Sequence, residues 1–161
     1  MTHRIRVAGL VRRGEEILLV QQQNRHGVRS WSIPGGRLEP SDTDIFRGAE
    51  REVWEETGLK VKAGALRFVS EYLAPDLFAI TLIIECYLAE DEHPDNIHLN
   101  NIMEDDNIHG VAWWSIAKIQ TTEEPMSRTL GRPEFWEALG GSEGMVYLGR
   151  HNDKAPFNAG V

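Results

Sequence analysis

The chain has 161 residues, of which 41% are hydrophobic and 26% are charged, and its net charge is −8. These values predict one domain with its own hydrophobic core, and no apolar run approaches the roughly 20 residues that a membrane span needs. The acidic balance argues against a broad nucleic-acid-binding face, but a small anionic substrate stays open because bound cations reverse the local charge. Cys86 is the only cysteine, so an internal disulfide is excluded, the thiol is expected in the core, and a cytoplasmic location is the default.

The first third of the chain predicts strands joined by turns that contain glycine. Apolar runs typical of buried strands lie at residues 5–11, 17–20 and 31–33. The Gly-Glu pair at residues 14–15 predicts a hairpin turn, and the Pro-Gly-Gly sequence at residues 34–36 predicts a turn that stops the third strand. Residues 24–30 between the second and third strands form a basic loop.

A helix is predicted next, beginning at residues 41–44 and ending at Gly58. Ile45, Ala49 and Val53 recur every four residues and give the helix one apolar face. Gly58 is expected to end the helix, because glycine readily adopts the left-handed conformation found after the last helical turn.

The second half predicts strands, one long polar segment and two short helices. Strands are expected at residues 66–70, 77–88, 111–114 and, from a weaker pattern, 145–148. Helices are expected at residues 115–119 and 133–139, the second with Gly140-Gly141 after its end. Residues 74–76 predict a turn, and residues 90–107 a polar loop. Strands in succession around one central helix indicate an α+β domain with a mixed sheet over residues 1–161, of which about 141–161 are a C-terminal extension.

Three glutamates, Glu52, Glu55 and Glu56, lie near the end of the central helix. At about 100° per residue they fall within one arc of about 100°, so their carboxylates share a face. Like charges at this spacing destabilise a helix by roughly 0.2–0.5 kcal/mol per pair, and here they also oppose the negative end of the helix dipole. Carboxylate oxygens are the ligands that Mg²⁺ prefers, so the glutamates predict a metal site.

The segment from Gly36 to Leu59 resembles the box of the MutT-like Nudix hydrolases, G-x5-E-x7-R-E-U-x-E-E-x-G-U, where U is aliphatic. The second half of the box matches at each fixed position, namely Arg51, Glu52, Val53, Glu55, Glu56, Gly58 and Leu59. Asp42 stands where the pattern has its first Glu, and eight residues instead of seven separate it from Arg51. Either the loop before the helix is one residue longer or the first helical turn is irregular, and counting back from Arg51 places the Glu position at Thr43.

The resemblance implies a Nudix-type α/β/α sandwich with a mixed sheet and a catalytic loop-helix. It also implies hydrolysis of a pyrophosphate bond in a nucleoside diphosphate derivative by a metal-activated water. Mg²⁺ or Mn²⁺ would be bound by Glu52, Glu55, Glu56 and the carbonyl of Gly35, while Arg51 would orient the glutamates. The expected partner is a small nucleotide; a membrane is not expected, nucleic acid is disfavoured, and a homodimer is left open.

The general base and the substrate contacts lie outside the matching half of the box. Glu104, followed by Asp105, is the candidate base from the polar loop, and Glu55 or Glu56 is the alternative. The candidate substrate contacts are Arg25, Arg29 and Arg37 for phosphates, and Tyr72 and Phe78 for stacking on a base. Pro75 lies where ADP-ribose-hydrolysing relatives have a proline, although an ordinary turn explains it equally well. Trp54 points away from the glutamates and is assigned to packing.

Several functions are compatible with these residues. ADP-ribose or a nucleotide sugar is the favoured substrate class, with nucleoside triphosphates and dinucleoside polyphosphates as alternatives. A catalytically silent nucleotide-binding module would explain the altered Asp42 end of the box. Pyrophosphate removal from RNA 5′ ends is the third alternative, and the net charge argues against it.

Overall fold

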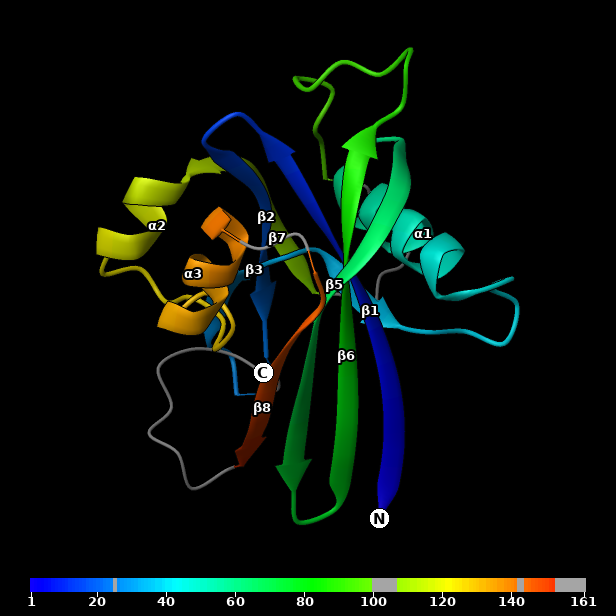
Figure 1. Ribbon diagram of the computed structural model, residues 1–161, viewed down its shortest axis with the longest axis vertical. Helices are drawn as coiled ribbons and strands as arrows, with labels where there is room; N and C mark the ends of the chain where they lie inside the picture. The colour runs from blue at the N-terminus through cyan, green and yellow to red at the C-terminus, as the bar shows by residue number, and fades with distance from the viewer. Residues whose placement is uncertain (25, 100–106, 142–143, 153–161) are drawn as a thin grey trace.

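An eight-stranded mixed sheet forms the centre of the molecule in the computed structural model, which describes residues 1–24, 26–99, 107–141 and 144–152 (Figure 1). The strands are β1 (Thr2–Arg13), β2 (Glu16–Gln23), β3 (Arg29–Ser32), β4 (Gly35–Arg37), β5 (Val61–Ala74), β6 (Leu77–Leu88), β7 (Ile108–Ser115) and β8 (Val146–Asn152). Their order is β3-β2-β1-β6-β5-β8, with β4 paired to β1 and β7 paired to β2. The pairs β1–β6 and β5–β8 are parallel, and the others are antiparallel.

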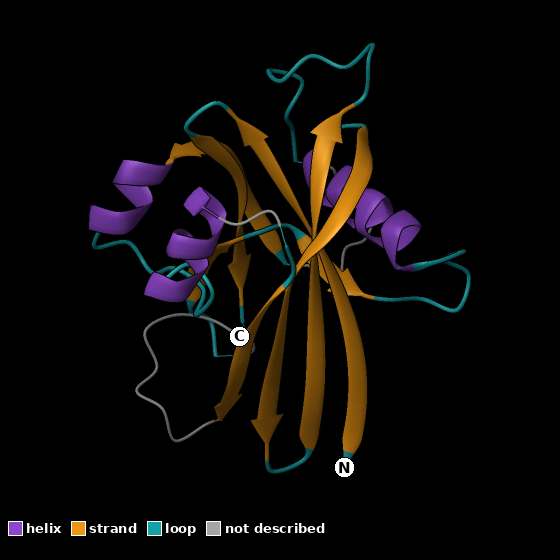
Figure 2. Ribbon diagram, in the orientation of Figure 1, coloured by secondary structure: helices purple, strands orange, loops and turns teal. Residues whose placement is uncertain are grey.

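Helices cover both faces of the sheet, so the expected helix–sheet–helix sandwich is confirmed (Figure 2). Helix α1 (Ile45–Thr57) packs on one face, and α2 (Ile116–Thr121) and α3 (Pro133–Gly141) pack on the other. Because successive strand side chains point to opposite faces, β1 contributes to both cores. Val7 and Val11 pack with α1, whereas Leu10 packs in the cluster that contains α2 and α3 residues.

Several expected element boundaries are confirmed. Strand β6 spans the expected residues 77–88, and the expected turn lies between β5 and β6 at residues 75 and 76, whereas Ala74 still belongs to β5. Strand β5 is longer than the predicted residues 66–70. Its start was missed because Lys62, Ala63 and Gly64 interrupt the apolar pattern from which the strand was predicted. Cys86 is 1% exposed within the core, and burial raises the pKa of its thiol to about 12.

Two predictions about glycines were wrong. The residues Gly35–Arg37, expected to include a turn, form strand β4, in which Gly35 pairs with Ala8 of β1. A Cβ atom at Gly35 would lie 2.5 Å from the carbonyl oxygen of Val7, so the glycine serves close strand packing. Helix α3 also continues through Gly141, whereas it was expected to end before Gly140.

The polar segment after β6 contains no helix or strand over residues 89–99, and the rest of the predicted loop, residues 100–106, lies outside the described residues. Strand β8 lies within the predicted C-terminal extension and forms the edge of the sheet beside β5. Within the described ranges, no helix is long and apolar enough to span a membrane.

Candidate active site

Helix α1 is capped at both ends, by Asp44, the last residue of the predicted start range, and by Gly58, the predicted end. The Asp44 side chain accepts a 2.8 Å hydrogen bond from the backbone N–H of Arg47, as an N-cap residue does. Gly58 follows the helix in the left-handed conformation, with φ 77°, and its N–H donates to the Trp54 carbonyl. These caps fix the length of the helix and therefore the positions of its glutamates relative to β4.

Arg51 lies at the centre of a cluster of carboxylates. Its Nε and Nη2 donate to the two oxygens of Asp42 at 2.7 and 2.9 Å, a bidentate pair. Its Nη1 donates to Glu52 at 2.9 Å and to Glu55 at 3.1 Å. A further 3.1 Å bond reaches the backbone carbonyl of Arg37 on β4. The guanidinium thus ties the helix to the preceding loop and strand.

The irregular spacing of the box is absorbed in the loop before α1. Asp42 contacts Arg51 and has a side chain only 5% exposed, whereas Thr43 is exposed. The Asp42 carboxylate also accepts from the backbone N–H of Glu39 at 2.9 Å. Its hydrogen bond with Arg51 lowers the pKa of Asp42 and raises the pKa of Arg51. Asp42 therefore anchors Arg51 despite the extra residue.

Glu52 lies against β4, the short strand that contains Gly35 and Gly36 and is called the glycine strand below. Glu52 and Glu56 are 4% and 3% exposed, which is rare for charged side chains. A Cβ atom at Gly36 would lie 2.6–2.7 Å from the Glu52 carboxylate. Gly48 has a similar role one turn earlier, where a Cβ atom would lie 2.8 Å from Leu38. Glycines on both sides thus allow the helix and β4 to approach closely around the carboxylates.

The donor chemistry of Glu52, Glu55 and Glu56 fits a hard divalent cation, since all three supply carboxylate oxygens and Glu52 lies close to Gly36 of β4. The three carboxylates do not gather around one point, although their spacing on the helix predicts that they do. In the part of the chain that the structure describes, no three Asp, Glu, His or Cys side chains gather closely enough to hold an ion. Glu52 and Glu55 both bond to Arg51 instead.

The residues expected to contact the substrate are not brought together. Arg29, at the start of β3, donates to Gln23, and Arg37 is an exposed residue of β4. Tyr72 lies beneath Arg128, whereas Phe78 lies beneath Arg150 and beside His3. Tyr72 shares the sheet face of Phe68 and Phe78 the face of Leu82, which belong to different cores, so the two aromatic rings cannot stack on one base. The predicted phosphate contact Arg25 and the candidate bases Glu104 and Asp105 lie outside the described residues.

Trp54 was wrongly assigned to packing, because it is 40% exposed on α1. Its direction away from the glutamates was expected from the helical period. The period could not reveal whether another element covers that side of the helix.

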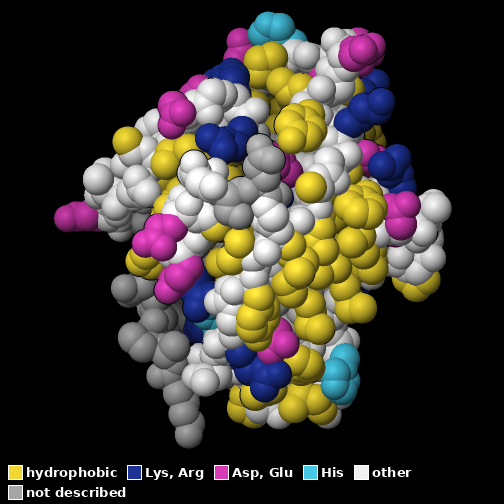
Figure 3. Space-filling view, viewed as in Figure 1, with side chains coloured by type: hydrophobic (Ala, Val, Ile, Leu, Met, Phe, Trp, Pro, Cys, Tyr) yellow, Lys and Arg dark blue, Asp and Glu magenta, His cyan; other side chains and the backbone are white. Residues whose placement is uncertain are grey.

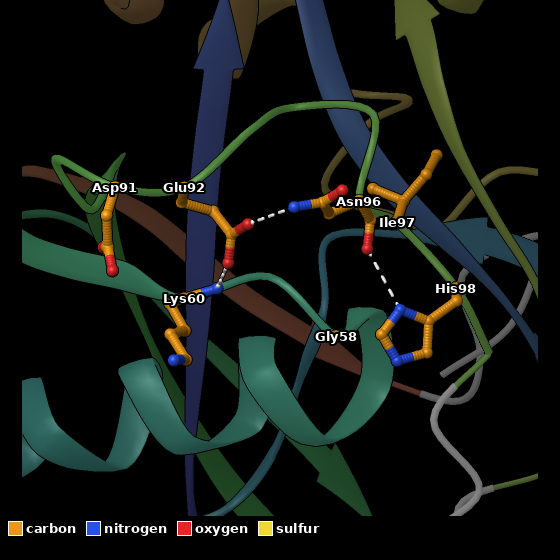
Figure 4. Close-up of a pocket in the computed structure, with 7 residues that line it drawn as sticks. All are labelled: Gly58, Lys60, Asp91, Glu92, Asn96, Ile97 and His98. Atoms are coloured by element: carbon orange, nitrogen blue, oxygen red, sulfur yellow. Dashed lines mark hydrogen bonds between the residues drawn. The ribbon is translucent and has the colours of Figure 1, made fainter.

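An open pocket of about 540 Å³ lies at the C-terminal end of α1 (Figure 4). Its lining consists of Gly58, Lys60, Asp91, Glu92, Asn96, Ile97 and His98. Glu92 accepts hydrogen bonds from the backbone N–H of Lys60 at 2.8 Å and from the Asn96 side chain at 2.9 Å. The His98 ring packs against Gly58, and its backbone N–H donates to Thr57 at 2.9 Å. The aperiodic sequence of this loop carries no signal for these contacts.

Comparisons with known proteins agree with this architecture. The NUDIX domain model matches residues 2–132. A MutT-like protein of Streptomyces ambofaciens is 37% identical over 84 residues, which are 52% of this chain and 51% of that protein. The 8-oxo-dGDP phosphatase NUDT18 of Homo sapiens is 42% identical over 57 residues, which are 35% of this chain and 17% of that protein. The matches thus span about half, or less, of these curated relatives.

A solved structure supports the same similarity. The crystal structure of MutT protein from Methanosarcina mazei Go1 has 26% sequence identity and a TM-score of 0.59, over 76% of this chain and 83% of that chain.

Proposed function

The chain belongs to the NUDIX domain family, and on this premise we propose that it hydrolyses a pyrophosphate bond in a nucleoside diphosphate derivative with a divalent cation. The observation that carries the proposal is the position of Arg51 between Asp42, Glu52 and Glu55, beside β4. This cluster concentrates negative charge where α1 meets the glycine strand, as a cation site requires.

Mg²⁺ or Mn²⁺ is proposed to bind the carboxylates of Glu52, Glu55 and Glu56 with the carbonyl of Gly35. When bound, the cation would neutralise pyrophosphate oxygens and make water a stronger acid near neutral pH. Arg51 holds Glu52 and Glu55 in place through hydrogen bonds of 2.9 and 3.1 Å. A guanidinium anchored by Asp42 therefore positions the carboxylates and offsets part of their mutual repulsion.

A carboxylate near the cation is proposed to accept the proton of the attacking water. Glu104 is the candidate from the loop after β6, and Glu55 or Glu56 is the alternative on α1. The 3.1 Å bond from Arg51 holds the Glu55 carboxylate in one position on α1. Exchanging each candidate for glutamine, which cannot accept a proton in this way, separates them by the loss of kcat.

ADP-ribose or a nucleotide sugar is the first substrate class to test, with a nucleoside triphosphate or a dinucleoside polyphosphate as alternatives. The name of the human relative adds 8-oxo-dGDP to the panel. A cytoplasmic location fits these substrates and the single buried thiol of Cys86. The proposal does not depend on a homodimer, and the oligomeric state is to be measured separately.

The test is a panel of these nucleotides with Mg²⁺, with Mn²⁺ and with EDTA, with the products identified by mass. Product that forms only with a divalent cation supports the proposal, and the bond that is cleaved names the leaving group. Glu137→Gln, an exposed change on α3, is the matched control for glutamate variants on α1. A folded wild-type protein that neither binds a divalent cation nor forms product from any nucleotide contradicts the proposal.

A second candidate is a nucleotide-binding module without catalysis. The observation that favours it is that Glu52 and Glu55 bond to Arg51 and do not converge with a third carboxylate in the described residues. Saturable nucleotide binding by calorimetry, with no product after long incubation in Mn²⁺, would favour this candidate over the first.

A further inference from the structure

Strand β8 carries a bulge at Gly149, an extra residue that shifts by one position which of its side chains face each side of the sheet. Gly149 has φ 88°, and the register with β5 shifts there, between Val69 and Glu71. After the bulge, Arg150 pairs with Glu71, whereas His151 lies opposite Tyr72. His151 therefore lies on the face that α3 covers, and Arg150 lies on the face that α1 covers.

Two arginines from the segment before α3 lie beside His151. The guanidinium of Arg128 lies 5.5 Å from the centre of the Tyr72 ring, and its Nη1 donates to the Asn152 carbonyl at 3.2 Å. The guanidinium of Arg132 lies beside Gly149, where an added Cβ atom would be 3.7 Å from its Nη2. Three basic side chains thus gather around the end of β8, and each residue is half-buried.

Two members of the cluster, Arg132 and His151, carry nitrogen atoms without a partner in the described residues. Neither Arg132 nor His151 forms an ion pair with a carboxylate in the described ranges, and Arg132 Nη1 and His151 Nε2 are buried there with no hydrogen-bond partner. Burial, followed by the charges of Arg132 and Arg128, lowers the pKa of His151. Buried polar groups are normally hydrogen-bonded, and buried charges are normally paired.

Arginines elsewhere on the sheet are paired differently. Arg67 is almost as buried as the carboxylates of α1 and donates to Glu85 at 3.0 Å. Arg150, the neighbour of His151, pairs with Glu71 on the opposite face. The unsatisfied nitrogens at Arg132 and His151 therefore point to an anion as the missing partner.

We propose that Arg128, Arg132 and His151 form a binding site for a phosphate group, separate from the glutamates of α1. Guanidinium forks match the oxygens of a phosphate, and an imidazole adds a further donor. The sheet lies between this cluster and α1, so the site is independent of the proposed hydrolytic centre (Figure 1). Figure 3 shows that Lys and Arg side chains, in dark blue, occur in several separate places on this view. His151 lies beyond the residues that the family model matches.

The test is calorimetry on the full chain in EDTA, which removes divalent cations from the glutamates. The probes are inorganic phosphate, pyrophosphate and AMP, with adenosine as the probe that lacks a phosphate. We expect saturable binding of at least one phosphate probe and none of adenosine. Tighter binding of AMP than of inorganic phosphate identifies a nucleotide as the source of the group, and the reverse identifies a free phosphate.

Variants separate this cluster from general surface charge. Arg132→Gln is expected to weaken phosphate binding by about tenfold or more, because it removes a charged donor. Arg150→Gln removes the same charge from β8 on the opposite face of the sheet. This variant is expected to leave the phosphate affinity unchanged. His151→Gln provides the same test if Arg132→Gln does not fold, and phosphate should raise the melting temperature of the wild type more than that of this variant.

Three outcomes overturn the proposal. They are the absence of saturable phosphate binding by the wild type, equal affinity in the wild type and in both cluster variants, and an equal loss in Arg150→Gln.

Discussion

Asp42 accepts two hydrogen bonds from Arg51, at 2.7 and 2.9 Å, across a loop that is one residue longer than the usual box. The same guanidinium reaches Glu52 and Glu55. The positions of the Glu52 and Glu55 carboxylates therefore depend on Asp42, a residue outside α1. A shorter acidic side chain and a longer loop give the arginine an anchor without changing the spacing of the glutamates.

Asp42→Ala is expected to destabilise the protein by about 2–4 kcal/mol, because it leaves a partly buried guanidinium without its bidentate partner. Thr43→Ala is the matched control, since Thr43 is the neighbouring position that counting back from Arg51 designates, and it is exposed. Urea unfolding of both variants measures the difference. Equal losses of stability at the two positions would show that Asp42 does not anchor Arg51.

Acid should weaken the same pair. Arg51 lowers the pKa of Asp42, so this carboxylate contributes stability that is fully present above its ordinary pKa of about 3.9 and is lost as pH falls through the lower folded value. The stability advantage of the wild type over Asp42→Asn should therefore be constant above about pH 5 and shrink below about pH 4. Urea midpoints measured across this range test the prediction, and an advantage that stays constant to about pH 2.5 would refute it.

Gly36→Ala should reduce activity far more than stability. The added Cβ would lie 2.6–2.7 Å from the Glu52 carboxylate, so the end of this flexible side chain must move. We expect kcat to fall by about 100-fold or more, because small displacements in an active site have large kinetic effects. The melting temperature should change by only a few degrees. Gly140→Ala, where a Cβ meets no atom within 4 Å, is the control, and equal kcat in the two variants would argue against Glu52 as a ligand.

Gly58→Ala should lower the free energy of unfolding by more than backbone strain alone would. Gly58 has φ 77°, and an added Cβ would also overlap the ring of His98. Gly14 has φ 59° with nothing within 4 Å, so Gly14→Ala isolates the backbone cost, about 1–2 kcal/mol. We expect Gly58→Ala to lose at least about 1 kcal/mol more than that.

A double variant assigns the extra cost at Gly58. Adding His98→Ala to Gly58→Ala removes the overlapping ring and should recover part of the lost stability in urea unfolding. No recovery would show that the His98 ring does not cause the additional destabilisation.

The sequence was most informative where local signals decide the structure. Helix α1 was located by Asp44, Gly58 and the apolar spacing between them, and β6 by one long apolar run. Strand β4 was missed because its glycines are needed for packing against β1, and this need cannot be distinguished from a turn signal in a single sequence.

Tertiary contacts account for the rest of what was missed. The exposure of Trp54 depends on which elements reach α1, which the helical period does not contain. Arg132 and His151 come from segments far from the box and meet only because β8 pairs with β5 and bulges at Gly149. The glutamates were identified by their spacing and the orienting role of Arg51 by the resemblance, but the anchoring of Arg51 by Asp42 became apparent only in the fold.

The most direct measurement is divalent-dependent turnover by the wild type and by Glu56→Gln, on the nucleotide that the panel identifies as the best substrate. Glu56 is 3% exposed on α1, and its exchange for glutamine removes one carboxylate while keeping the side-chain shape. We expect turnover by the wild type that EDTA abolishes, and a kcat about 100-fold lower or more in the variant at an unchanged melting temperature. Equal kcat in the two proteins, or wild-type turnover that persists in EDTA, would contradict a metal site at the glutamates.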